Sequence, residues 1–178
     1  MPLENNSSQL IEEIKLFIHY SVPEDDLQPA LALVDRYAKN AFQLRLLREY
    51  YTNLPEARED AVVKISRLIH QQGVHLMVAT TTSFSYLYAV TAEHVLLLGE
   101  YLQVVDTEVL SFFGLEDQEE FGKLCLPVEE LKEYVASPTT RQSICPVCGV
   151  PEGENHLFGC TVEICPWCEG QLSYCNCR

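Results

Sequence analysis

The sequence predicts an α+β fold in which a helical N-terminal part is followed by a small antiparallel sheet and a small cysteine-rich tail. Three observations support this order. Apolar residues recur at helical spacing over much of the first 72 residues. From Val74 onward the pattern changes: residues 74–79 are strand-like, and residues 84–90 alternate with a period of two, which is typical of strands. Seven of the eight cysteines lie between Cys145 and Cys177, and they mark the tail as a separate segment.

Three helices are expected before the sheet. The first covers residues 8–20, where Leu10, Ile11, Ile14, Phe17 and Ile18 fall at helical spacing. The second runs from about 30 to 51, with Pro29 in its first turn. The third covers about 56–72, and Gly73 is suited to cap its C-terminus. Its apolar face would consist of Val62, Ile65, Leu68 and Ile69.

The sheet and the segments after it follow from shorter patterns. Strands are expected over residues 74–79, 84–90, 94–98 and 101–105, as a small antiparallel meander packed against the helices. Short helices are expected from Thr107 to just before Gly114, over 116–124 and over 128–136. The stretch from Ser137 to Thr140 is typical of a linker. The chain therefore divides into an α+β domain over residues 1–137 and a tail module over residues 138–178.

Composition restricts the classes of protein that the chain can belong to. With 47% hydrophobic and 21% charged residues in 178, it is globular. The strongest apolar run, Val95 to Leu98, is far short of the ~20 residues that a membrane span needs. The first basic residue is Lys15, so we expect no secretory signal and a cytoplasmic location. A net charge of −14 disfavours nucleic acid as a partner, because phosphates attract Lys and Arg.

Eight residues of the tail have the chemistry of zinc ligands, and they form four pairs. The pairs are Cys145 with Cys148, His156 with Cys160, Cys165 with Cys168, and Cys175 with Cys177. Structural zinc takes four Cys or His ligands, whereas catalytic zinc keeps one position for water. Eight ligands fill two tetrahedral sites with none left over. We therefore expect two structural Zn2+ ions per chain.

The spacing of the pairs predicts how they combine. The two Cys-Pro-x-Cys turns are separated by 16 residues, which is a zinc-ribbon spacing. We expect the first site to consist of Cys145, Cys148, Cys165 and Cys168, and the second of His156, Cys160, Cys175 and Cys177. A sequential pairing stays open, in which His156 and Cys160 complete the first site. A disulfide framework and an iron site are further alternatives for these cysteines.

The tail resembles a cysteine-rich, zinc-ribbon-like C-terminal module that is found on many bacterial proteins. The resemblance rests on Cys145-Pro-x-Cys-Gly, His156, Gly159-Cys160, Glu163, Cys165-Pro-x-Cys, Gly170-Gln-Leu and Cys175-x-Cys177. It covers about 34 of the 178 residues. The module implies zinc binding, but it brings no activity to the chain. Residues 1–137 show no such resemblance.

Residues before the tail offer weaker hypotheses. Cys125 could be a nucleophile paired with His75 or His94, but a small buried thiol is the simpler interpretation. The hydroxyl-rich stretch Thr80 to Ser83 could contact a phosphate, although it lacks the glycines and the lysine of a P-loop. Tyrosines of the sheet could stack on bases, but no basic residue accompanies them and core positions are expected instead. These tyrosines are Tyr86, Tyr88 and Tyr101.

The leading functional hypothesis is a zinc-binding interaction protein that docks onto another protein. Trp167 lies at the tip of a predicted zinc turn, where it would anchor a partner or pack on the first domain. The acidic segments around Glu119 and Glu129 are expected to be solvated faces, with a basic partner as the alternative. The second hypothesis is an enzyme with its site in residues 1–137, and the third is a nucleic-acid adaptor that uses the ribbon. No catalytic residue is assigned.

Overall fold

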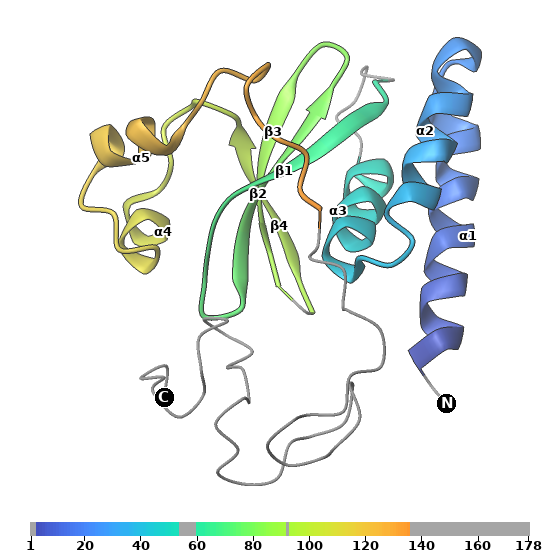
Figure 1. Cartoon of the computed structure of the whole chain (residues 1–178), viewed down its shortest axis with the longest axis horizontal. Helices are drawn as coiled ribbons and strands as arrows, with labels where there is room; N and C mark the ends of the chain where they lie inside the picture. Colours follow the sequence, from blue (N-terminus) through green and yellow to red (C-terminus); the bar gives the residue numbers. More distant parts are fainter. Residues whose placement is uncertain (1–2, 54–59, 92, 136–178) are drawn as a thin grey trace, which may run out of the picture.

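A computed structural model describes residues 3–53, 60–91 and 93–135. Within them, the chain forms five helices and four strands (Figure 1), which confirms the α+β class. In chain order these are α1 (Leu3–Ser21), α2 (Glu24–Arg36), α3 (Ala41–Thr52), β1 (Val62–Gln71), β2 (Val74–Thr81), β3 (Ser85–Val90), β4 (Val95–Glu100), α4 (Thr107–Phe112) and α5 (Gln118–Leu124). The predicted tail module lies outside the described residues.

The four strands form one antiparallel meander in the order β1-β2-β3-β4. The turn between β1 and β2 is formed by Gln72 and Gly73, whose φ angles are 48° and 77°. Two consecutive residues with positive φ are typical of a type I′ hairpin turn, and glycine is the preferred residue at the second position. The strands predicted over 74–79, 84–90 and 94–98 are therefore confirmed as β2, β3 and β4.

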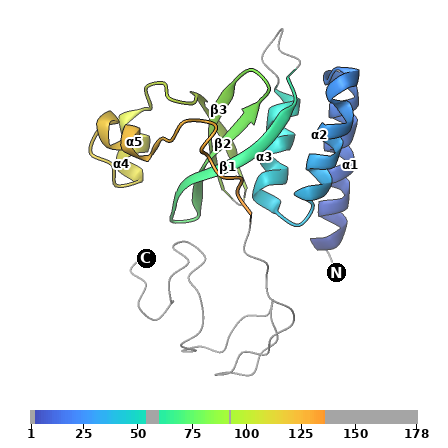
Figure 2. The same cartoon turned by 45° about the horizontal axis from the view of Figure 1, so that its top comes forward.

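Helices cover both faces of the sheet. Helices α2 and α3 lie against one face, with α1 packed on both of them, while α4 and α5 lie toward the other face (Figures 1 and 2). Along β2, Met77 and Ala79 belong to the core on the α1–α3 side, and Leu76 and Val78 belong to the core on the α4–α5 side. Every β2 residue from His75 to Thr81 is buried for this reason. The sheet is thus the middle layer of the fold.

The helical segment predicted over 30–51 is wrong as a single helix. Helix α2 starts at Glu24 and has acidic residues in its first turn, where the helix dipole favours negative charge. It ends at Arg36, and α3 starts again after Asn40. The side-chain oxygen of Asn40 accepts hydrogen bonds from the backbone N–H groups of Phe42 (3.0 Å) and Gln43 (3.2 Å). This cap satisfies two of the unpaired donors at the start of α3.

Three further sequence predictions are corrected by the structure. Residues 62–71 of the helix predicted over 56–72 form strand β1, and Gly73 belongs to a hairpin turn rather than to a helix cap. Residues 101–105 are not a strand, because the chain leaves the sheet after Glu100. The stretch 128–135 is a turn followed by extended chain rather than a helix. The short helices predicted from Thr107 and over 116–124 are confirmed as α4 and α5.

Candidate functional site

All eight predicted zinc ligands lie outside the described residues. These are Cys145, Cys148, His156, Cys160, Cys165, Cys168, Cys175 and Cys177. Among the residues that the structure does describe, no group of three or more His, Cys, Asp or Glu side chains is placed to hold a metal ion. The zinc sites therefore stay a prediction from the sequence.

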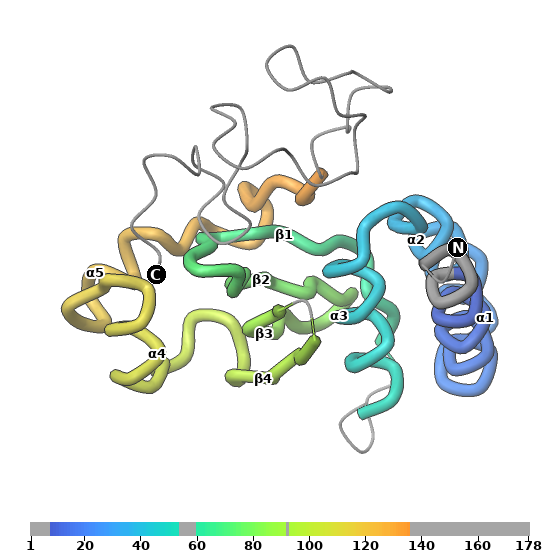
Figure 3. The backbone as a smooth tube through the Cα atoms, turned by 90° about the horizontal axis from the view of Figure 1, so that it is seen from below, coloured from blue at the N-terminus to red at the C-terminus, as the bar shows by residue number. Residues whose placement is uncertain are grey.

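The chain segment that leads toward the tail is fixed to the outer edge of β1. We call this segment, Val128–Val135, the strap; it is drawn in orange along β1 in Figure 3. Glu133 of the strap forms an isolated antiparallel bridge with Ser66 of β1. The backbone N–H of Tyr134 donates to the carbonyl oxygen of Ile65 at 2.8 Å. The strap thus satisfies part of the sheet edge that would otherwise be open.

Glu133 connects the strap to the end of α2. Its carboxylate accepts hydrogen bonds from Arg36 Nη1, at 2.9 Å to one oxygen and 3.2 Å to the other, and from the Tyr37 hydroxyl at 2.6 Å. The same hydroxyl accepts from the backbone N–H of Ile65 at 3.0 Å. Burial raises the pKa of Tyr37 well above its usual range, and the hydrogen bond to Glu133 raises it further. Tyr37 is therefore a neutral donor at this contact.

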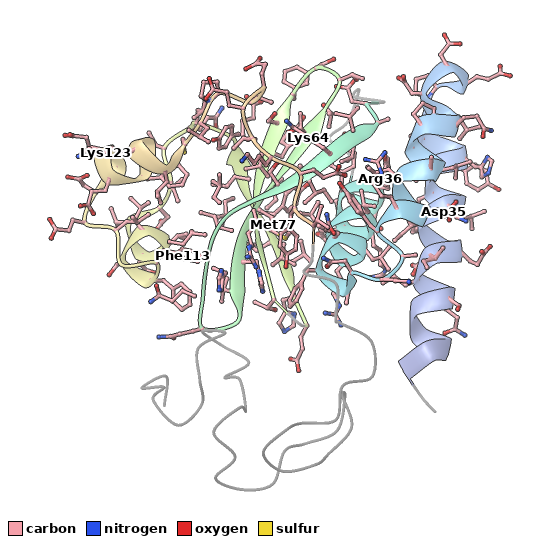
Figure 4. All side chains as sticks on the ribbon, in the orientation of Figure 1. Asp35, Arg36, Lys64, Met77, Phe113 and Lys123 are labelled. Atoms are coloured by element: carbon pink, nitrogen blue, oxygen red, sulfur yellow. The ribbon has the colours of Figure 1, made fainter. Side chains whose placement is uncertain are left out.

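Two cations and one amide hold the rest of the strap. Lys64 Nζ of β1 donates to the carbonyl oxygens of Val128 (2.8 Å) and Leu131 (2.7 Å), and Figure 4 labels both Lys64 and Arg36. Arg67 lies over the ring of Tyr134, 4.4 Å from its centroid, which is a cation–π contact. Gln43 Nε2 of α3 donates to the carbonyl oxygen of Tyr134 at 2.8 Å. Charged donors make strong hydrogen bonds, so these contacts fix the strap firmly.

A cavity of about 470 Å³ lies between α1, α3 and the start of β4. Its wall contains the ion pair of Glu13 with Arg48, whose shortest N–O distance is 2.9 Å, together with Arg45, Glu49 and Glu93. Among the residues that the structure describes, no cysteine, histidine or hydroxyl side chain lines it. The cavity therefore holds one ion pair and three further charged side chains, and the nucleophile-and-base arrangement of an active site is not found among its described lining residues.

A second cavity, of about 370 Å³, borders the hydroxyl-rich stretch Thr80 to Ser83. Asp60 determines the chemistry of this stretch. Its carboxylate accepts hydrogen bonds from the hydroxyls of Thr82 (3.2 Å) and Ser83 (3.3 Å), and the Thr81 hydroxyl lies at 3.4 Å. A carboxylate in this position repels a phosphate. The contacts favour an ordinary strand connection, which is the interpretation that the sequence already supported.

The structure favours the packing interpretation of Cys125, as the sequence indicated, over a pairing with His75 or His94. Cys125 packs with the core on the α4–α5 side, whereas the ring of His75 packs against Phe42 of α3 on the opposite face of the sheet. His94 is exposed, next to Glu93. Burial raises the pKa of the Cys125 thiol, and a hydrogen bond with Tyr101 lowers it in part. A neutral, partly buried thiol is a packing residue rather than a nucleophile.

The tyrosines of the sheet are core residues, as the sequence indicated. Tyr86 and Tyr88 belong to the core beneath α3, and Tyr101 belongs to the core on the other face. The hydroxyl of Tyr101 donates to the carbonyl oxygen of Leu126 at 2.9 Å. None of the three rings is more than 7% exposed, so they do not form a platform for bases.

Sequence reasoning missed the strap, although side chains of three separate elements bond to it. Its anchors come from α2, α3 and β1, at positions up to 97 residues away from it. The one signal available was Lys64, a cation in the middle of an otherwise apolar stretch. Such a residue in a strand requires acceptors from another segment, and the strap provides them.

Comparisons of the chain with protein-family models, with curated proteins and with solved structures find no match. Among the described residues, no helix combines the length and the hydrophobicity that crossing a membrane requires.

Proposed function

We propose that the chain is an intracellular interaction protein whose tail binds two structural zinc ions and docks onto another protein. The observation that carries this proposal is the set of eight Cys and His ligands between Cys145 and Cys177, in four closely spaced pairs. Four ligands for each ion leave no position for a catalytic water. The zinc then stabilises a small recognition module, because a segment of this size has too little apolar surface to fold alone.

The strap supports a docking role, because it fixes the point from which the tail starts. Ten residues, 135–144, separate Tyr134 from Cys145. A chain of that length spans at most about 35 Å. The predicted module therefore stays near the β1 edge. A partner that contacts both the module and this edge binds with higher affinity, because the second contact forms at a high effective concentration. A partner made of protein fits the acidic chain better than nucleic acid does, because its net charge is −14.

Zinc content tests the central part of this proposal. Metal analysis of the full chain, purified without chelator, is expected to give two zinc ions per chain. Cys145→Ser is expected to lower the amount of tightly bound zinc, because it removes a ligand of one site. Cys125→Ser is the matched control, since Cys125 is excluded from the ligand set and its thiol packs beside Tyr101. A zinc content near zero, with the tail cysteines in disulfides, would contradict the proposal.

Partner binding tests the docking role separately. We expect Trp167→Ala to retain both zinc ions and to weaken the binding of proteins that co-purify with the full chain. Cys145→Ser is expected to weaken the same interactions by destabilising the module. If the co-purifying proteins and their amounts are the same for both variants and for the unchanged chain, the tail is not the docking module, whatever its metal content.

A further inference from the structure

The two edges of the sheet differ in how they are covered. The strap lies along the outer edge of β1, whereas no described segment pairs with the outer edge of β4. Figure 3 shows the strap and β4 on opposite sides of the sheet. An uncovered edge presents unpaired N–H and C=O groups to any strand that can approach it. The edge of β4 is therefore the place where this sheet can be extended.

The side chains of β4 favour such an extension. Residues 95–99 carry no charge and no proline, the two features that usually protect an edge strand. Leu96 is 61% exposed and Leu97 is 46% exposed, each on a different face of the sheet. One extra residue at Leu98 interrupts the pairing with β3, but the pairing from Val95 to Leu97 is regular.

The backbone of β4 determines which residue can lie at the centre of a new contact. The N–H of Thr91 donates to the carbonyl of His94, so that pair is hydrogen-bonded across the turn. In an antiparallel ladder the pairs alternate between bonded and non-bonded. Val95 and Leu97 consequently lie in non-bonded pairs, and their N–H and C=O groups point away from β3. Leu96 already bonds to β3, so it cannot lie at the centre.

We propose that the outer edge of β4 pairs with β4 of a second copy of this chain, antiparallel, about a two-fold axis through Leu97. The two Leu97 residues then form a hydrogen-bonded pair, and the two four-stranded sheets become one continuous sheet. Leu96 lies opposite Leu98 and Gly99 of the second copy, since Leu98 is an extra residue in β4. Both exposed leucines of each copy are thereby covered, one on each face.

Charge complementarity identifies the second copy as the occupant. Glu100 lies directly opposite Tyr86, so its side chain is on the α1–α3 face. Because Leu98 is an extra residue in β4, the register moves on by one residue there. The two-fold axis therefore places Glu100 of the second copy opposite Val95. Val95 lines the cavity that also contains Arg45 of α3, and the Arg45 side chain makes no ion pair or hydrogen bond among the described residues. The dimer therefore contains two symmetric contacts, in each of which the Glu100 carboxylate of one copy lies next to Arg45 of the other.

The mass of the full, zinc-loaded chain in solution tests this proposal, by sedimentation over a range of concentrations. We expect a dimer that dissociates on dilution. Leu97→Lys is expected to give a monomer, because it puts two like charges opposite each other at the axis. Val104→Lys is the matched control: Val104 is 85% exposed and lies outside β4, so this variant should remain dimeric. Thermal unfolding of both variants checks that they are folded.

A charge exchange tests the contact between copies. Arg45→Glu and Glu100→Arg should each raise the dissociation constant at least tenfold, and the two changes together should restore it. The amides of Val95 and Leu97 should exchange hydrogen more slowly in the dimer than in Leu97→Lys. A chain that is monomeric at about millimolar concentration would overturn the proposal. So would a dimer unaffected by Leu97→Lys, because it would form through another surface. None of these results depends on which partner the tail binds.

Discussion

The hydroxyl of Tyr37 donates a 2.6 Å hydrogen bond to Oε1 of Glu133, a residue 96 positions further along the chain. The hydroxyl oxygen of Tyr37 also accepts from the backbone N–H of Ile65 at 3.0 Å. One side chain at the end of α2 therefore joins the strap to the edge strand β1. The Glu133 carboxylate and the Ile65 N–H both depend on the Tyr37 hydroxyl. Removing that hydroxyl therefore lowers the free energy of unfolding more than the loss of a surface ion pair does.

Tyr37→Phe is expected to lower the free energy of unfolding by about 2 kcal/mol, because it leaves the Ile65 N–H and one Glu133 oxygen without this partner. Urea denaturation followed by circular dichroism measures the change. Tyr20→Phe is the control: Tyr20 is 83% exposed, and its change should stay within about 0.5 kcal/mol. Equal stability of the two variants would show that the contact contributes nothing.

Alkaline pH is expected to destabilise the protein. Burial raises the pKa of Tyr37, Tyr50, Tyr51, Tyr88 and Tyr101, and that of Tyr51 rises to about 12. In the unfolded chain a tyrosine loses its proton near pH 10. Between that pH and the raised pKa the folded state binds more protons, so the stabilisation is complete below about pH 10 and is lost above it.

Urea denaturation between pH 8 and pH 11.5 measures this loss. Each tyrosine that titrates only on unfolding contributes a slope of up to about 1.4 kcal/mol per pH unit. Absorbance at 295 nm should show that part of the nine tyrosines ionise only when the chain unfolds. A free energy of unfolding that stays constant up to pH 11.5 would rule out this explanation.

Phe121→Ala is expected to lower the free energy of unfolding by about 3–5 kcal/mol, since it leaves a cavity in the core on the α4–α5 side. Phe121 is 1% exposed in that core. Phe112→Ala removes a phenyl ring that is 38% exposed, and we expect less than half of that loss. If Phe121→Ala melted only α4 and α5 and left the sheet intact, the two cores would be independent units.

A peptide of residues 141–162 distinguishes the two ways of pairing the zinc ligands. It contains all four ligands of the sequential first site, but only Cys145 and Cys148 of one interleaved site and His156 and Cys160 of the other. We expect it to bind zinc weakly and to stay disordered in NMR spectra. One tightly bound zinc ion with dispersed amide signals would favour the sequential pairing.

Truncation of the full chain provides a second test of the same pairing. Removing residues 174–178 deletes Cys175 and Cys177 together. In the interleaved arrangement, the site of His156 and Cys160 then loses its zinc, while the site of Cys145 and Cys148 keeps it. Metal analysis should give one zinc ion per chain. Protection of Cys145 against alkylation should persist, and its loss would favour a different ligand set.

The sequence predicted the α+β class and the position of three strands, because β2, β3 and β4 have short periodic patterns bounded by turns. It failed for β1 because Val62, Ile65 and Ile69 fall at helical spacing. The strand has register shifts after Val62 and after Arg67, so that Val62 and Ile65 share the core on the α1–α3 side while Ile69 packs with the core on the other face. Each shift changes which face the following residues occupy, so the period of two is lost.

The strap could not be predicted, since its contacts are tertiary. Val128 and Leu131 are three residues apart, which is also the spacing of a short helix. In the structure the Val128 carbonyl accepts from the Leu131 N–H in a single turn, and the carbonyl oxygens of both residues also accept from Lys64 of β1. The same holds for the boundary of α3: Asn40 is a good cap residue, but an apolar pattern running across it suggested one continuous helix.

The position of the strap has a mechanical consequence. A partner that binds the tail and pulls on it applies its load to the chain at Val135, next to Tyr134 and Glu133. The load first reaches the Tyr134–Ile65 hydrogen bond and the Glu133–Arg36 ion pair. The ladders of β1 with β2 and of β2 with β3 lie behind those contacts. Under tension the strap detaches before the sheet opens, and the chain lengthens as Leu131 and Tyr134 leave the two cores while the ladders between the strands persist.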